Sequence, residues 1–217
     1  MKRMRVRAVT PLGRVKLLYM MVFAAYATTV IYRTIYYRRV GLDTGQIGVL
    51  IALQPLLMLV AGPIWSAIAD RLGIRSRLLT LVMGLSIVPM VAMAFVQSFV
   101  GLFVLSVLHA LLQAPIEPLM NATALSTLGE ERHQFSIIRG WGSLGYAPVA
   151  WLMGVLLETI NIRWIFGAYA LLMGISALIS LTFAGERVTL LRPGLFGQVW
   201  AARSAGGRRC RRGLRSG

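Results

Sequence analysis

The chain has 217 residues, of which 57% are hydrophobic and 14% are charged, and its mean hydropathy is +0.71. Soluble domains carry about 25% charged residues, so this composition excludes an ordinary soluble domain and indicates an all-α polytopic membrane protein. One cysteine, Cys210, excludes an internal disulfide framework, and two histidines supply no metal cluster. The net charge of +16 lies at the termini and in short loops, which favours anionic lipid over nucleic acid as its partner.

The first apolar run follows a basic N-terminus. Residues 1–16 hold six Lys or Arg and no acid, and they are predicted to be cytoplasmic. The run over residues 17–37 is long enough to span a membrane. The alternative is a signal peptide cleaved after the small residues Ala25 and Ala27, but the apolar run continues past that point to full spanning length.

A cation and three aromatic residues lie near the far end of this first run. Arg33 is predicted to extend its long side chain to the membrane surface. Its aromatic neighbours are typical of an interfacial belt, in which amphipathic rings lie at headgroup level. These neighbours are Tyr32, Tyr36 and Tyr37.

Five further apolar segments complete a predicted bundle of six membrane helices. Residues 78–116 contain no Asp, Glu, Lys or Arg and are too long for one helix, so we expect a turn at Gln97–Ser98. Pro55, Gly62 and Pro63 interrupt the second segment, as membrane helices tolerate. The predicted helices span residues 17–37, 44–69, 78–96, 99–124, 136–157 and 164–183.

The loops predict the orientation. Six helices leave both termini on one side, and 19 of the 23 Lys and Arg fall on that side. The positive-inside rule therefore places both termini in the cytoplasm of a cell, or inner, membrane. Residues 184–217, with eight Arg and seven Gly, are predicted to form a disordered cytoplasmic tail on the membrane surface; the alternative is a truncated or artefactual end.

The fourth and fifth predicted helices carry the candidate binding residues. Gln113, Glu117 and Asn121 recur every four residues and therefore share one helix face. A polar stripe on a membrane helix should face protein or water, and an ionisable residue within it is a site hypothesis. Arg139 on the next helix is the predicted partner of Glu117, and Tyr146, seven residues later, shares its face. The alternative is a structural ion pair that joins the two helices.

Other residues on these helices have simpler interpretations. Gly140, Gly142 and Gly145 are predicted to let the fifth helix pack closely. His109 lies two turns before Glu117, where a hydrogen bond between helices is favoured over a proton relay. We find no phosphate-binding loop, metal-ligand cluster or nucleophile–base pair, so the sequence predicts no cofactor and no enzyme activity.

The loop after the second predicted helix resembles the G-x-x-x-D-R-x-G-R-R segment of the major facilitator superfamily. The match covers the Asp-Arg pair and the following glycine, and it departs from the pattern at Ser66 and Ile74. An ordinary positive-inside loop is the alternative. The resemblance implies a conformational-switch loop made of Asp70, Arg71, Gly73 and Arg75.

Residues 41–48 resemble the first extracellular turn of one branch of that superfamily. The branch includes the lactose permease, nucleoside–proton symporters and phenylpropionate permeases. In the lactose permease, a glutamate after an Ala-Pro pair and an arginine on the next helix hold the sugar, and residues 114–117 and 138–146 are similar to those segments. The resemblance and the polar face together predict a substrate-binding set made of Glu117, Arg139, Tyr146, Gln113, Asn121 and Trp141.

The resemblance spans about residues 11–184, which is the first six-helix half of the twelve-helix family fold. It implies a secondary active transporter, present as a half or fragment, that carries a sugar, nucleoside or aromatic acid by proton-coupled symport. A second six-helix half is then an expected partner, because one half supplies only one wall of a cavity. The alternative is a non-transporting membrane remnant, or a scaffold or regulatory partner.

Overall fold

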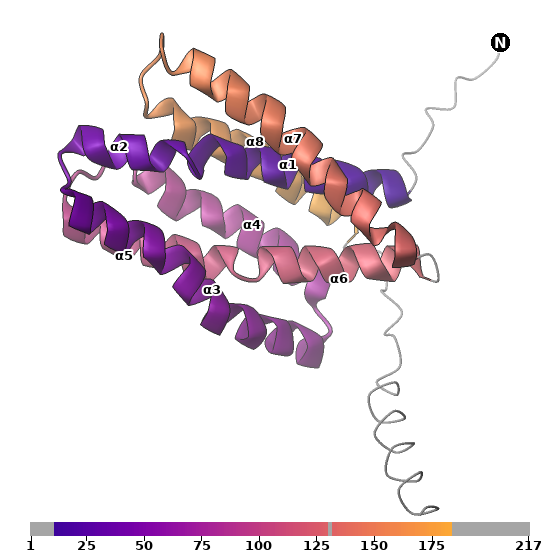
Figure 1. The fold of residues 1–217 in the computed structure, drawn as a ribbon. Coiled ribbons are helices and arrows are strands. Elements are labelled where there is room, and N and C mark those ends of the chain that lie inside the picture. The colour runs from indigo at the N-terminus through magenta and orange to yellow at the C-terminus, as the bar shows by residue number, and fades with distance from the viewer. Residues whose placement is uncertain (1–10, 130–131, 184–217) are drawn as a thin grey trace, which may run out of the picture. The chain divides into compact units, whose positions relative to one another are not determined.

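The computed structural model describes residues 11–129 and 132–183, apart from the side chains of Ser66, Asp70, Leu72 and Arg132. All regular elements in this part of the chain are helices, so the predicted all-α fold is confirmed (Figure 1). The basic N-terminus up to residue 10 and the Arg-rich tail lie outside it. The helices are α1 (Pro11–Thr29), α2 (Tyr32–Val40), α3 (Thr44–Leu72), α4 (Arg75–Ala92), α5 (Phe99–Gln113), α6 (Ile116–Leu128), the 3₁₀ turn η1 (Arg132–Gln134), α7 (Phe135–Leu156) and α8 (Trp164–Leu181).

Local sequence signals account for where several helices begin and end. Asp43 and Gln46 form a capping box at the start of α3, in which each side chain accepts a hydrogen bond from the other residue's backbone N–H. Gly41 after α2 and Gly73 after α3 have φ values of +93° and +65°. Both glycines adopt the left-handed conformation that commonly terminates a helix.

The first and fourth predicted helices each consist of two helices in the structure. α1 ends at Thr29, where the hydroxyls of Thr28 and Thr29 donate to carbonyls three residues earlier. α5 ends at Gln113. Pro115 follows, and it has no backbone N–H to donate the next helical hydrogen bond. In contrast, α3 continues without interruption through both of its prolines.

Five segments in the described part of the chain are long and apolar enough to cross a membrane. α7 is less apolar, but its 22 residues extend for about 33 Å at 1.5 Å per residue, which also reaches across a hydrocarbon core of about 30 Å. Large apolar side chains are exposed along α3, α4, α7 and α8, as expected where lipid covers the bundle. The five segments are Pro11–Val40, Thr44–Ala69, Arg75–Ala92, Phe99–Leu128 and Trp164–Leu181.

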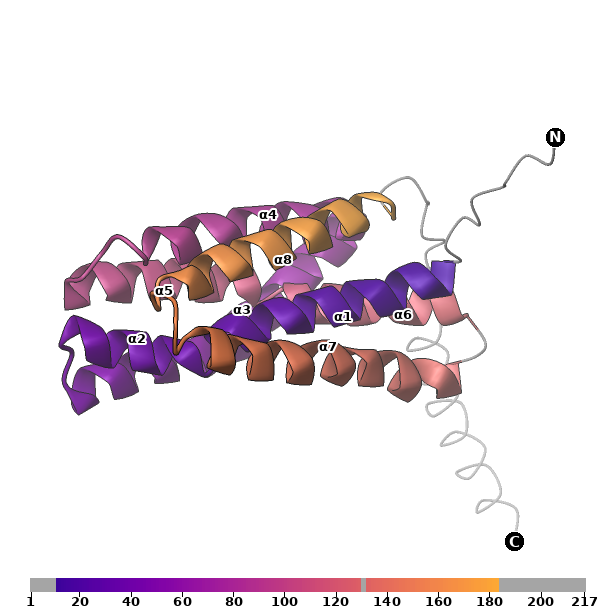
Figure 2. The same cartoon turned by 90° about the horizontal axis from the view of Figure 1, so that it is seen from above.

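α1 occupies the centre of the bundle. It packs against α6, α7 and α8, whereas α4 packs against α5 and α8 (Figures 1 and 2). In the view from above, α4 and α8 lie on one side of α1, and α7 lies on the other. We call the end at which α1 and α7 begin and α3 and α6 end the N-proximal end, and the end at which α2 ends and α3, α5 and α8 begin the distal end (Figure 1).

The contact between α1 and α7 depends on two glycines. A Cβ atom at Gly145 would lie 2.1 Å from the backbone oxygen of Met20, and one at Gly142 would lie 3.0 Å from the Phe23 ring. The predicted close packing is therefore confirmed for these two positions. It is wrong for Gly140, where a Cβ atom would meet nothing within 4 Å.

Substitution of Gly145 by Ala should force α7 away from α1, because the contacted atom belongs to the backbone and cannot rotate aside. We expect the melting temperature of the detergent-solubilised protein to fall, with a destabilisation of about 1–3 kcal/mol, as for other overpacked interiors. Gly140→Ala is the matched control on the same helix and should leave the melting temperature unchanged or raise it, since alanine favours helix. Equal melting temperatures for the two variants would contradict the close approach.

Candidate functional site

Three helices meet around the hydroxyl of Tyr19 on α1. This buried hydroxyl donates a 2.5 Å hydrogen bond to Oδ1 of Asn121 on α6. Glu117 on α6 and Arg139 on α7 both lie close enough to the Tyr19 hydroxyl to act on it electrostatically. We call these four residues the Tyr19 cluster.

The two charged residues of the Tyr19 cluster lie at different depths along the bundle. At 1.5 Å per residue, Arg139 lies about 6 Å into α7 from the N-proximal end, and Glu117 lies about 17 Å from that end of α6. Tyr19 lies about 12 Å into α1, between these depths. Glu117 is half-buried and Arg139 is exposed, so a solute hydroxyl that reached Tyr19 could lie between an acceptor and a donor.

The two aromatic residues predicted for the site lie along the contact between α7 and α1. Trp141 is near the N-proximal end, where the Lys16 ammonium lies 5.5 Å from the centroid of its ring, as in a cation–π pair. Tyr146 is half-buried, packs against the core and lies near Tyr32. The two rings therefore have neighbours on α1 and α2, respectively.

Gln113 belongs to a second polar cluster. Its buried side-chain oxygen accepts a 3.0 Å hydrogen bond from the Gln54 amide of α3, and the Gln54 oxygen accepts a 2.5 Å hydrogen bond from the Arg33 guanidinium of α2. We call these three residues the Arg33 cluster. The prediction that Arg33 extends to the membrane surface was wrong, because its guanidinium turns inward to the amide of a neighbouring helix.

The three tyrosines predicted to form an interfacial belt instead bind other helices. Tyr36 is buried and donates a 2.8 Å hydrogen bond to the backbone oxygen of Met93. Tyr32 donates to the backbone oxygen of Ala150, and the Tyr37 hydroxyl lies 3.4 Å from that of Ser106. The belt prediction was wrong because the hydroxyls find partners within the protein.

His109 confirms the prediction of a histidine that bonds between helices. Its Nε2 atom lies 3.2 Å from the hydroxyl of Tyr169 on α8, which in turn lies 3.2 Å from the hydroxyl of Ser86 on α4. All three side chains are buried. This chain joins α4, α5 and α8 on the side of the bundle that lies away from α7 (Figure 2).

Sequence reasoning missed Tyr19 and Gln54 as members of polar clusters. Both could have been found, because a polar side chain inside a long apolar run requires a partner within the protein. Arg33 was noticed, but its position was judged from the run over residues 17–37. The helical segment extends to Val40, which leaves Arg33 about 10 Å from the distal end.

The predicted conformational-switch loop lies at the N-proximal end. Gly73 supplies the left-handed turn between α3 and α4, and Arg75 is the first residue of α4. Arg71 is exposed in the last turn of α3. The side chain of Asp70 lies outside the described part of the structure.

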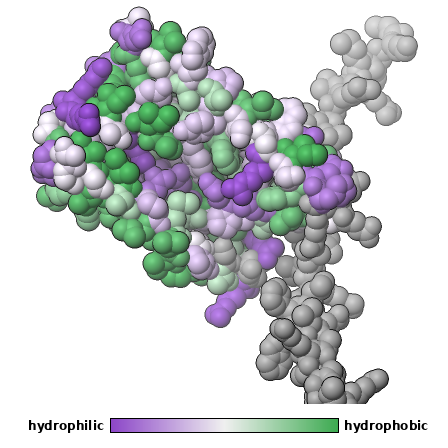
Figure 3. Space-filling model, viewed as in Figure 1, coloured by the Kyte–Doolittle hydropathy of each residue, from purple (hydrophilic) through white to green (hydrophobic). Residues whose placement is uncertain are grey.

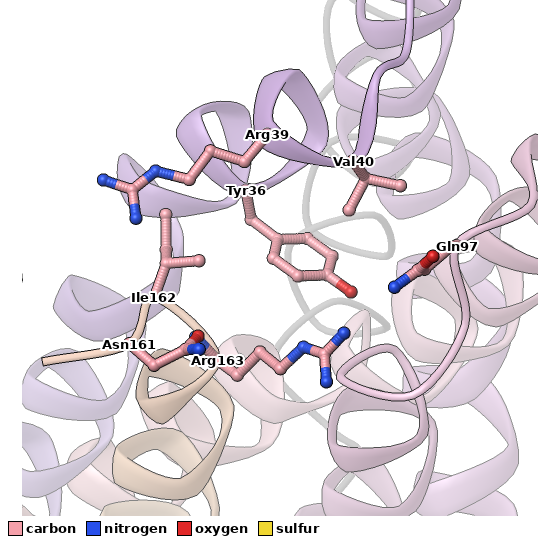
Figure 4. Close-up of a pocket in the computed structure, with 7 residues that line it drawn as sticks. All are labelled: Tyr36, Arg39, Val40, Gln97, Asn161, Ile162 and Arg163. Carbon is pink, nitrogen blue, oxygen red and sulfur yellow. The ribbon is translucent and has the colours of Figure 1, made fainter.

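Hydrophilic residues gather in the centre of the face that Figure 1 presents, and apolar residues surround them (Figure 3). A separate cavity of about 300 Å³ lies at the distal end (Figure 4). Its lining residues come from α2, from the turn before α5 and from the loop before α8. They are Tyr36, Arg39, Val40, Gln97, Asn161, Ile162 and Arg163, none of which was predicted for the site. No group of three or more His, Cys, Asp or Glu occurs among the described residues.

Comparison with known proteins gives a family and several relatives. The sequence model of the MFS_1 like family matches residues 12–190. The maltose permease of Geobacillus stearothermophilus is 30% identical over 156 residues, which cover 71% of this chain and 40% of that protein. The multidrug resistance protein MdtG of Dickeya zeae is 26% identical over 78% of this chain and 43% of its own length.

A third relative, the uncharacterized transporter YwbF of Bacillus subtilis, is 26% identical over 68% of this chain and 37% of its own length. The chain thus spans about two fifths of the length of the curated relatives it matches. All three names describe membrane carriers or resistance proteins.

The hydrogen bond between Tyr19 and Asn121 should couple the stability effects of substitutions at the two residues. In a double-mutant cycle with Tyr19→Phe and Asn121→Leu, we expect a coupling energy of about 0.6–1.7 kcal/mol, the range for hydrogen bonds between membrane helices. Reversible unfolding in mixed micelles would measure it. The control cycle pairs Tyr19→Phe with Ser98→Ala at the distal end and should be additive. Additivity in both cycles would show that the bond contributes nothing to the fold.

Proposed function

The chain belongs to the MFS_1 like family of the major facilitator superfamily, and we propose that it forms the N-terminal six-helix half of a secondary active transporter. The observation that supports this proposal is the hydrogen bond that joins Tyr19 of α1 to Asn121 of α6, one helical turn after Glu117, beside the helix α7 that carries Arg139. An ionisable residue inside a membrane segment, such as Glu117, is by default a functional-site hypothesis. In this proposal Glu117 accepts hydrogen bonds from the solute and Arg139 donates them.

We further propose that the solute lies against the face of the bundle on which hydrophilic residues gather in Figure 3. Tyr19, Asn121 and Gln113 then orient the solute, and Tyr146 and Trp141 offer aromatic surface to a ring. The curated relatives include a maltose permease and a multidrug resistance protein. The proposed solute is accordingly a small organic molecule such as a sugar, a nucleoside or an aromatic acid.

Transport requires a second wall for the cavity. We propose that a second six-helix half faces this one, so that rocking of the two halves exposes the site to either side. Asp70, Arg71, Gly73 and Arg75 would act as the hinge contact at the N-proximal end. We also propose that an inward proton gradient drives uptake, so a protonophore should abolish it.

The proposed orientation places the N-proximal end in the cytoplasm of the cell, or inner, membrane. In a Cys210→Ser background, Thr159→Cys at the distal end should react with a membrane-impermeant maleimide in intact cells. His133→Cys at the N-proximal end should react only after permeabilisation, because the bilayer shields it. Both residues are exposed on the protein, so the side of the membrane on which each lies decides whether it reacts. The reverse labelling pattern would place the termini outside.

Glu117 and Arg139 should both be needed for uptake. Cells that express this chain with a second half would be tested with radiolabelled sugars, nucleosides and aromatic acids. We expect Glu117→Gln and Arg139→Gln each to reduce uptake at least about tenfold, because each removes a charge-assisted hydrogen bond worth about 1.5–3 kcal/mol. Arg38→Gln, at an exposed position and with the same charge change as Arg139→Gln, is the control and should retain uptake. Normal uptake by both site variants, with equal membrane levels, would refute the proposed site.

A further inference from the structure

The Arg33 cluster contains a cation whose charge is not balanced within the described part of the chain. Arg33 lies inside the membrane-spanning segment Pro11–Val40, and its guanidinium donates to the neutral amide oxygen of Gln54. The carboxylates of this part of the chain have other places: Asp43 caps α3, Glu158 is exposed in the distal loop, and Glu117 belongs to the Tyr19 cluster. An arginine at membrane depth is costly unless an anion or water accompanies it.

The cluster lies near the middle of the bilayer. Gln54 is ten residues from the start of α3, which places it about 15 Å from the distal end, half of a hydrocarbon core of about 30 Å. Gln113 is fourteen residues from the start of α5, about 21 Å from the same end. Secondary transporters bind their solutes at this depth, between the two halves of the fold.

The hydrogen bonds of the cluster leave donors unused and acceptors occupied. The oxygen of Gln54 accepts from Arg33, and the oxygen of Gln113 accepts from Gln54. A guanidinium carries five N–H donors and no acceptor, so Arg33 has donors beyond this one bond. Such a set of donors is complementary to an acceptor with several lone pairs and no proton to donate.

We propose that the Arg33 cluster binds a carboxylate of the transported solute, with the Arg33 guanidinium as the charged donor. A carboxylate supplies the missing negative charge and can accept two parallel hydrogen bonds from a guanidinium. Gln54 and Gln113 act as positioning residues that hold the guanidinium at mid-membrane depth. This inference rests on the proposed transport function, and within it selects organic acids over neutral sugars and nucleosides.

Binding to the full chain in lipid nanodiscs tests the proposal without requiring transport. Isothermal titration would compare two matched pairs of probes: glucuronate with glucose, and benzoate with benzamide. We expect the anionic member of at least one pair to bind about tenfold more tightly or better, as for a charge-assisted hydrogen bond. Absence of such a preference in both pairs overturns the proposal.

Substitutions assign the preference to Arg33. Arg33→Gln should reduce the ratio of anionic to neutral affinity to about one, whereas Arg38→Gln, an exposed arginine on the same helix, should leave it unchanged. If Arg33→Gln does not fold, Arg33→Lys replaces it and should retain only part of the preference, since an ammonium cannot form the two parallel bonds. An equal loss in the Arg38 and Arg33 variants overturns the proposal.

Two further outcomes separate this proposal from its alternatives. A carboxylate of the second half could pair with Arg33 instead. Arg33→Gln would then weaken association of the halves and leave the anion preference intact, which overturns the proposal. The proposed transport function fails separately, if no solute enters cells that contain both halves. In that event a preference for anions that depends on Arg33 would still establish the carboxylate site.

Discussion

The bilayer core offers no water to hydrogen-bond polar groups, so the polar side chains of this bundle need partners in their own helix or on another helix. Tyr19 bonds to Asn121, Arg33 to Gln54, and the hydroxyls of Ser86 and Tyr169 to each other. Each bond joins two different helices and therefore fixes how they are rotated and how far they slide. The apolar surfaces cannot do this alone, since lipid tails cover them as well as another helix does.

The polar bonds divide into sets with different consequences. The chain from His109 through Tyr169 joins α4, α5 and α8, and its members are buried. The Tyr19 and Arg33 clusters join α1, α2, α3, α5, α6 and α7, and their charged members are half-buried or exposed. A fully buried neutral chain stabilises an interface, whereas partly exposed charges remain able to exchange a protein partner for a solute. In the transport function that we propose, this exchange would let the solute bind reversibly.

Composition and apolar run lengths were sufficient to predict the all-α membrane fold. The ends of the helices were harder to predict, because no proline or glycine marks the break before Tyr32 in the sequence. The sequence also indicated that Glu117, Asn121 and Arg139 belong near one another, since polar residues are rare in such runs. It could not give the partners of Gln113 or Arg33, because those depend on how α2, α3 and α5 are rotated. The rotation of a helix is set by its contacts with several other helices. The hydrophobic periodicity of one helix gives no information about those contacts.

The central position of α1 also bears on how the protein is made. α1 is made before the other described helices, yet the close approach of its Met20 to Gly145 requires a helix made about 125 residues later. At synthesis rates of about 5–20 residues per second, that interval is about 6–25 seconds. During it, the hydroxyl of Tyr19 lacks Asn121, and the surface that will meet α7 and α8 faces lipid or the insertion machinery. The most buried helix of the finished bundle is therefore the one that waits longest for its neighbours, and an insertase that shelters such a helix would act at this stage.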